Sequence, residues 1–322
     1  MNVRLRLVLA LSLLAGCGSK ETPVEYSSFP DGIFKLGGPV RAMAVTSDGN
    51  QVFFTAGEAV EIRTFGGSAA QTLPCEQWPE TFALYQGGER LVVTMMPISD
   101  LRMPLAVWDW RAARVLARRV VDEGSRKLAV SSDDRLLAVA CCDNRIRTFT
   151  LPDLEPVRSF QPGATPSNLV FLRGSHRLAV AAGALECWDA DSGNRLETVP
   201  GSFPGPLALS PDGARLAALR ESGETVIYQI DGWRELAKLP TGDRFALAFS
   251  PDGKLLAAGG GYPDPCSIYD TATGKRVSSL ERPDPHIAGV SSVVSVVWVK
   301  GGDAVMVGDM DRSVRIHAKK KE

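Results

Sequence analysis

Residues Phe245 to Leu280 read FALAFSPDGKLLAAGGGYPDPCSIYDTATGKRVSSL and predict four short strands joined by tight turns. Every second residue from Phe245 to Phe249 is large and apolar, the period-2 pattern of a half-buried strand. Ser-Pro-Asp-Gly follows, in which proline presets φ for a turn and glycine accepts positive φ. The run 255–258 is apolar enough for a strand covered on both faces, whereas 276–280 is polar enough for a sheet edge. Such a unit cannot bury its sheet alone and needs copies of itself on either side.

The chain supplies these copies. Ser-Pro-Asp-Gly recurs at 210–213, and related turns, each leading into an apolar run, are found throughout the sequence. The full set of turns is 46–49, 86–88, 131–134, 173–175, 210–213, 250–253 and 300–303. Their spacing of about 40 residues is the repeat length of a four-stranded propeller blade. The sequence therefore predicts an all-β fold, a single seven-bladed β-propeller, with six or eight blades as alternatives.

The two ends of the repeat region complement each other. Residues 32–36 resemble the fourth, outer strand of a blade without the three strands that should precede it. The last blade, from Val293 onward, has three strands and no fourth. Pairing 32–36 onto that blade would close the ring and remove two open sheet edges. We therefore expect the propeller to cover 32–318, followed by a basic tail at 319–322.

Several short sequences resemble WD-repeat (WD40-like) propellers over about 32–318. They are Trp108-Asp109, Trp188-Asp189, Tyr269-Asp270, the two Ser-Pro-Asp-Gly turns and the segment Gly308–Ile316. In that last segment the resemblance implies that Asp311 accepts hydrogen bonds from backbone N–H groups. The chain lacks the family's Gly-His dipeptide, so the Asp–His–Ser–Trp hydrogen-bond network of that family cannot be complete. Trp108, Trp188 and Trp298 fall on predicted strands and are expected in the core.

The N-terminus has the features of an export signal. Arg4 and Arg6 precede an apolar run, 7–14, that is too short to span a bilayer as a helix. Leu-Ala-Gly-Cys then ends at Cys17 and resembles the bacterial lipobox, which implies cleavage after residue 16 and lipidation of Cys17. The alternative is an ordinary secretory signal with Cys17 incidental. We predict a signal peptide at 1–16, and a lipidated cysteine with a flexible tether at 17–31.

No catalytic motif is recognisable. Three histidines fall in different blades, and the chain contains no HExxH, GxSxG, Walker A or dinucleotide motif. The net charge of −1 provides no basic field for nucleic acid. Five cysteines remain beyond Cys17, an odd number whose spacing fits neither a zinc ribbon nor a redox motif, so no disulfide can be assigned. They are Cys75, Cys141, Cys142, Cys187 and Cys266. We predict no enzyme activity, no cofactor and no metal.

Recognition is instead expected on the narrow face of the propeller, which the b–c and d–a connections form. The b–c loop of blade two, 95–104, is unusually rich in methionine and other apolar residues, which suits a protein interface. Its candidate contact residues are Met96, Ile98, Leu101, Arg102 and Met103. A polar group from blade six and the next connection comprises Tyr262, Asp264, Arg282 and His286, and two aromatics in d–a connections, Trp78 and Phe203, complete the set.

These features together predict a membrane-anchored lipoprotein of the bacterial cell envelope, with the outer membrane favoured, that binds a protein partner and not nucleic acid. The alternatives are a lactonase- or quinoprotein-like propeller enzyme, and a module that binds a glycan or another small ligand.

Overall fold

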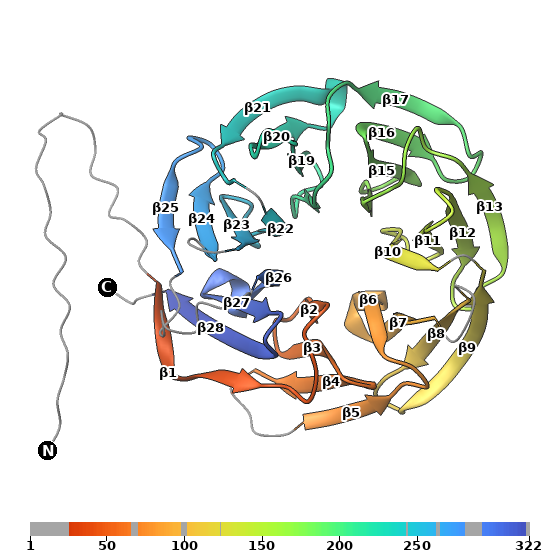
Figure 1. Cartoon of the computed structure of the whole chain (residues 1–322), viewed down its shortest axis with the longest axis horizontal. Coiled ribbons are helices and arrows are strands. Elements are labelled where there is room, and N and C mark those ends of the chain that lie inside the picture. Colours follow the sequence, from red (N-terminus) through yellow and green to blue (C-terminus); the bar gives the residue numbers. More distant parts are fainter. Residues whose placement is uncertain are drawn as a thin grey trace, which may run out of the picture.

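The computed structural model describes residues 26–65, 70–97, 102–122, 124–242, 244–261, 265–280 and 292–319. In that part of the chain, seven four-stranded antiparallel sheets stand around a common axis as the blades of a closed ring (Figure 1). The predicted seven-bladed β-propeller is therefore confirmed. No helix among the described residues is long and apolar enough to cross a bilayer.

Each blade contains four strands, which we call a to d from the ring axis outward. Blade one consists of β2 (Met43–Val45), β3 (Gln51–Ala56), β4 (Ala59–Thr64) and β5 (Ala70–Pro74). Blade two consists of β6 (Pro79–Tyr85), β7 (Arg90–Met95), β8 (Met103–Asp109) and β9 (Arg114–Val121). Blade three consists of β10 (Ser125–Val130), β11 (Leu136–Cys141), β12 (Ile146–Thr150) and β13 (Pro156–Phe160). Blade four consists of β14 (Asn168–Phe171), β15 (Arg177–Ala182), β16 (Ala184–Asp189) and β17 (Arg195–Val199). Blade five consists of β18 (Leu207–Leu209), β19 (Arg215–Leu219), β20 (Thr225–Gln229) and β21 (Arg234–Leu239).

Blade six contains the Ser-Pro-Asp-Gly turn at 250–253. Its strands are β22 (Arg244–Phe249), β23 (Leu255–Gly260), β24 (Cys266–Asp270) and β25 (Arg276–Ser279). Blade seven consists of β26 (Val293–Val299), β27 (Ala304–Asp309), β28 (Ser313–Lys319) and the N-terminal β1 (Tyr26–Lys35). In the described connections there are three single-turn 3-10 helices, η1 (Gln86–Gly88), η2 (Asp231–Trp233) and η3 (Lys300–Gly302).

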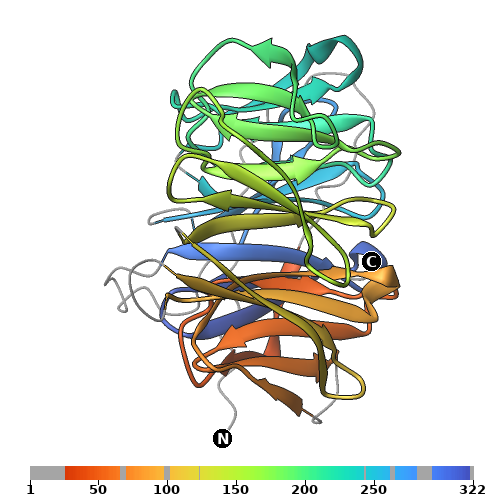
Figure 2. The same ribbon diagram turned by 90° about the vertical axis from the view of Figure 1, so that its right-hand side faces the viewer.

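The strands run across the thickness of the ring, so the connections emerge on two opposite faces (Figure 2). Because neighbouring strands are antiparallel, the b–c and d–a connections lie on one face and the a–b and c–d turns on the other. We call these the b–c face, which is the narrow face of the sequence analysis, and the a–b face.

The ring closes through β1, as the sequence predicts. Ile33, Phe34 and Lys35 pair with Arg315, Val314 and Ser313 of β28. A second stretch pairs Tyr26–Ser28 with His317–Lys319, after an irregularity between Ser28 and Ile33. The closing strand thus begins six residues before the expected Gly32, and β28 continues into the first residue of the expected tail.

The core consists of seven separate apolar clusters, one between each pair of neighbouring blades. Alternation along strand b explains this division, because successive side chains point to opposite blades. In β19, Leu216 and Ala218 pack toward blade four, whereas Ala217 packs toward blade six. The b strands are apolar at nearly every position for this reason. The three tryptophans predicted for the core, Trp108, Trp188 and Trp298, are all buried.

The described cysteines are all free thiols. Cys141, Cys187 and Cys266 are fully buried in strands, where they act as small apolar side chains. Cys75 and Cys142 are partly exposed.

Candidate functional site

On the b–c face, two of the predicted elements lie side by side. The backbone N–H of Met96 donates to the backbone oxygen of Trp78 at 2.7 Å, so the start of the blade-two loop rests on the d–a connection that carries Trp78. The Trp78 side chain is 38% exposed and Met96 is half-buried. Arg102, at the other end of the loop, is exposed and lies 3.5 Å from Asp122. This connection therefore offers an accessible aromatic ring beside a methionine.

Two predicted contact residues are buried, and the predictions for them are wrong. Met103 is the first residue of β8 and is only 2% exposed, and its Sδ atom lies against Gly124 at the start of blade three. Phe203 is completely buried in the cluster between blades four and five, with its ring centroid 6.2 Å from that of Tyr228. Its backbone N–H donates to Gly183, which draws the connection into the junction and directs the ring inward. Phe203 therefore stabilises the blade junction and does not contact a partner.

The other predicted residues lie outside the described part of the chain. They are Cys17, Ile98, Leu101, Tyr262, Asp264, Arg282 and His286, and for these the sequence predictions stand untested.

The structure reveals two exposed apolar side chains on the b–c face that the sequence analysis did not assign to it. Phe245 and Met310 are each 54% exposed. Phe245 was expected on the buried face of its strand. However, β22 has a bulge, with Arg244 paired to Gly260 and Ala246 to Gly259, so Phe245 is the extra residue and turns outward. Met310 occupies the polar b–c turn of blade seven, where an apolar residue was a signal that could have been noticed.

The same bulge recurs at the b–c end of strand a in other blades. In blade two the extra residue is Glu80, between Pro79 and Thr81, and in blade seven it is Val294. Glu80 accepts a hydrogen bond from Arg41 Nη1 at 2.7 Å. Lys127 follows the corresponding bulge in blade three, and its burial lowers its pKa despite the opposing charge of Glu80. The side chains at these bulges are therefore charged in blades two and three and apolar in blades six and seven.

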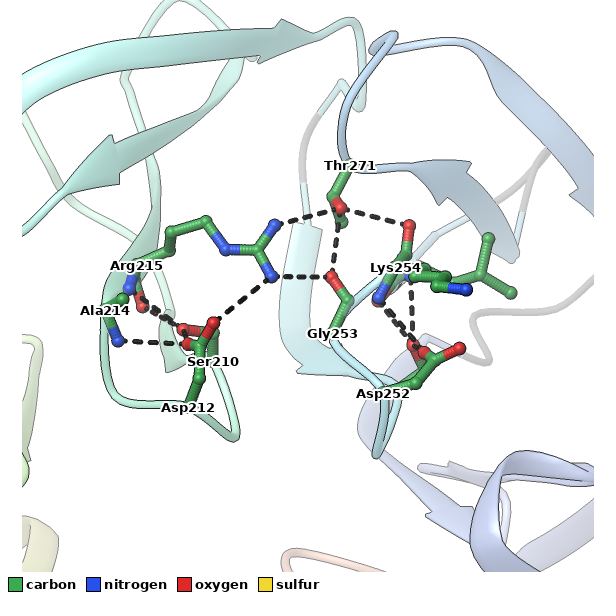
Figure 3. A network of polar contacts seen from close by, with 10 residues as sticks. Ser210, Asp212, Ala214, Arg215, Asp252, Gly253, Lys254 and Thr271 are labelled. Atoms are coloured by element: carbon green, nitrogen blue, oxygen red, sulfur yellow. Dashed lines mark hydrogen bonds and ion pairs between the residues drawn. The ribbon is translucent and has the colours of Figure 1, made fainter.

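The a–b face is built differently, from turns that bind the blades together. In the turn 210–213, Asp212 accepts a hydrogen bond from the Ser210 hydroxyl and another from the backbone N–H of Ala214 (Figure 3). These bonds lower the pKa of Asp212. Arg215 then reaches into blade six, donating from Nη2 to the Gly253 oxygen at 2.9 Å and from Nη1 to Thr271 at 3.2 Å. On the opposite face, in the b–c turn of blade seven, Asp311 accepts a hydrogen bond from the backbone N–H of Ser313, as the WD-repeat resemblance implies.

A histidine joins blades three and four on the same face. His176 lies between two carboxylates, with Nδ1 2.7 Å from Asp191 and Nε2 3.0 Å from Asp133. Although burial alone would lower the pKa of His176, these two hydrogen bonds raise it overall. The sequence placed His176 in a turn but could not show that Asp133, 43 residues away, lies opposite it.

Blade seven contains a buried ion pair that the sequence analysis also missed. Arg315 Nε lies 2.7 Å from Asp309 Oδ2 and its Nη2 lies 3.2 Å from Oδ1, with side-chain exposures of 4% and 1%. The pair stands beside the closing strand, since Arg315 is paired with Ile33. Among the described residues, no three His, Cys, Asp or Glu side chains gather into a group that could hold a metal ion.

Two curated proteins are similar to part of the chain. WD repeat-containing protein VIP3 of Arabidopsis thaliana is 26% identical over 141 residues, 40% of this chain and 44% of that protein. Small ribosomal subunit protein RACK1 of Caenorhabditis elegans is 26% identical over 119 residues, 34% of this chain and 35% of that protein. The match thus spans less than half the length of either relative. No family model matches the sequence. The fold is a seven-bladed β-propeller, and these partial similarities support a WD40-like one.

Proposed function

We propose that this protein is a non-catalytic scaffold that binds a protein partner through its b–c face. The observation that carries the proposal is the exposure of Trp78, Phe245 and Met310 on one face of a WD40-like ring. Aromatic and methionine side chains are enriched in the centres of protein interfaces. Arg41, Glu80 and Arg102 add charged groups of both signs around them, as expected for a polar rim.

The absence of catalysis is part of this proposal. Among the described residues, the carboxylates with lowered pKa values serve turns or blade junctions, and His176 already has a partner on each ring nitrogen. Such groups stabilise structure and are not free to exchange protons with a substrate.

We further propose that lipid on Cys17 holds the ring at a membrane of the bacterial cell envelope, with the outer membrane favoured. The support is the order of the leader, with its charged start, its apolar run and the Leu-Ala-Gly-Cys sequence. Replacing Cys17→Ala should abolish metabolic labelling by a palmitate analogue in the native host. Persistent labelling of that variant would exclude Cys17 as the lipid site.

The partner surface can be tested by site-specific crosslinking in intact cells. A photo-crosslinking amino acid in place of Phe245 or Met310 should give a discrete adduct with one protein. The matched control is Leu196, which is 47% exposed but lies on outer strand β17. If Leu196 gave the same adduct, or if Phe245 and Met310 gave none, the b–c face would not be the docking surface.

A further inference from the structure

The a–b face contains a pocket at its end of the ring axis, away from the proposed docking surface. Its volume is about 490 Å³, within the usual range for small-molecule sites, roughly 300–1,000 Å³. The floor is apolar and comes from strand a of four successive blades, two to five. It consists of Leu84, Val130, Val170 and Leu209. The rim comes from the a–b turns of blades three and four and carries two opposite charges, Asp134 and Arg173.

Asp134 occupies a position that the other turns of its kind give to glycine. Gly49, Gly213 and Gly253 hold the same place with φ of 72°, 73° and 69°, and Asp134 adopts φ of 61°. Asp133 already supplies the acceptor that the turn needs, since it binds the Ser131 hydroxyl and the backbone N–H of Arg135. The carboxylate of Asp134 makes no hydrogen bond or ion pair with any described residue. The carboxylate that stands in place of this glycine therefore serves no contact of its own turn.

Arg173 also has a charged group without a partner among the described residues. Its guanidinium forms no ion pair or hydrogen bond within the described part of the chain. Its stem, however, lies against Gly213 of the next blade, where an added Cβ would stand only 2.6 Å from Arg173 Cβ and 2.9 Å from Cδ. The stem is therefore held in place while the guanidinium stays available. Because Arg173 and Asp134 do not pair with each other, the pocket presents separated positive and negative groups above an apolar floor.

We propose that this pocket binds a short apolar peptide with free ends. Asp134 would receive the terminal ammonium, Arg173 the terminal carboxylate, and the floor the apolar side chains. An anion or a cation alone would be attracted by one rim charge and repelled by the other. A neutral apolar ligand would desolvate both charges and leave them unpaired, which is unfavourable. A zwitterion with an apolar body satisfies the whole lining, and a carboxylate is well matched to the planar guanidinium.

Calorimetry with three forms of one tripeptide, Leu-Ala-Leu, tests the proposal. The forms have free ends, an acetylated amino end or an amidated carboxyl end. For the native protein, each cap should weaken binding about 10-fold or more, since each removes a charge-assisted contact. Acetylation should have no further effect in Asp134→Gly, and amidation none in Arg173→Met. Arg135→Met, an exposed arginine of the same turn that does not line the pocket, is the matched control and should bind like the native protein.

These variants separate binding from folding. Asp134→Gly restores the residue found in the other turns, so its melting temperature should equal or exceed that of the native protein. Arg173→Met keeps an apolar stem over Gly213. If all three peptide forms bound alike, if none bound at millimolar concentration, or if free leucine bound as tightly as the tripeptide, the proposal would be overturned. None of these results bears on the partner surface of the b–c face.

Discussion

The closing strand pair contains a buried histidine that should make the fold sensitive to acid. His317, in β28, is 3% exposed, and its Nε2 atom is buried without a hydrogen-bond partner among the described residues. Burial, and then the positive charge of Arg315, lower the pKa of His317 from 6.5 to about 4. The backbone of this residue pairs with Ser28 of β1, so the histidine lies where the two ends of the chain meet.

The sign and size of the effect follow from the two pKa values. Because the folded state binds the proton less readily than the unfolded state, acid favours unfolding. The contribution of His317 to stability is complete above pH 6.5, falls as the pH decreases and levels off below about pH 4. A shift of this size is worth roughly 3 kcal/mol over the whole range, and about 2.5 kcal/mol between pH 7.5 and 4.5.

The assay compares the native protein with His317→Leu by denaturant unfolding at pH 7.5 and 4.5. Leucine is of similar size and leaves no buried polar atom unpaired, so the variant should be at least as stable at pH 7.5. Between the two pH values, the native protein should lose about 2.5 kcal/mol more than the variant, and this subtraction removes the contribution of every other titrating group. An equal loss in both proteins would refute the reasoning. An independent check is the NMR titration of the His317 ring in the native protein, where a pKa near 6.5 would contradict the burial argument.

Three further predictions concern contacts within and between the blades. Asp309→Asn removes the negative charge that faces the buried Arg315 guanidinium and should destabilise the fold by roughly 3–5 kcal/mol. Glu76→Gln, in an ion pair more than half exposed, should cost less than about 1 kcal/mol, and equal denaturant midpoints for the two variants would contradict this. Gly259→Ala would place a Cβ 2.3 Å from Val293 and should cost roughly 1–3 kcal/mol by overpacking, while Gly37→Ala, with nothing within 4 Å, should be neutral in the same measurement. His176→Gln should reduce stability most below pH 6.5 and least above the raised pKa of His176, because the bridge to Asp133 and Asp191 is strongest when the ring is charged; a difference that grew with pH would rule out the bridge.

Among the candidate functional residues, the exposure of a side chain could be predicted where the local sequence pattern alone decided it. Trp78 was placed correctly on an exposed connection, since the residues around it carry no strand pattern. Phe203 has a similar sequence context but is fully buried, because its backbone is bonded to Gly183 in the same blade and its ring faces Tyr228 of the next. Nothing in the sequence near these residues distinguishes the two environments. Phe245 shows the reverse error, since a bulge of one residue turned it from the buried face to the surface.

The sequence by itself predicted the propeller, with seven blades preferred to six or eight. Those features depend on residues close together in the chain, namely period-2 alternation, turn chemistry and a repeat of about 40 residues. The two halves of blade seven could also be matched from the sequence, because an orphan strand at one end complements a missing strand at the other.

Only the tertiary structure decided what the junctions between blades contain. Asp133 is hydrogen-bonded to His176, Arg215 donates a hydrogen bond to Gly253, and the Arg173 stem packs against Gly213. The two partners in each pair are about one repeat apart in sequence. The sequence contains both members of such a pair but does not show that they are in contact, because that depends on how closely neighbouring blades pack when the ring closes. The pocket bounded by Asp134 and Arg173 arises in the same way, since four blades contribute its floor and no single repeat contains it.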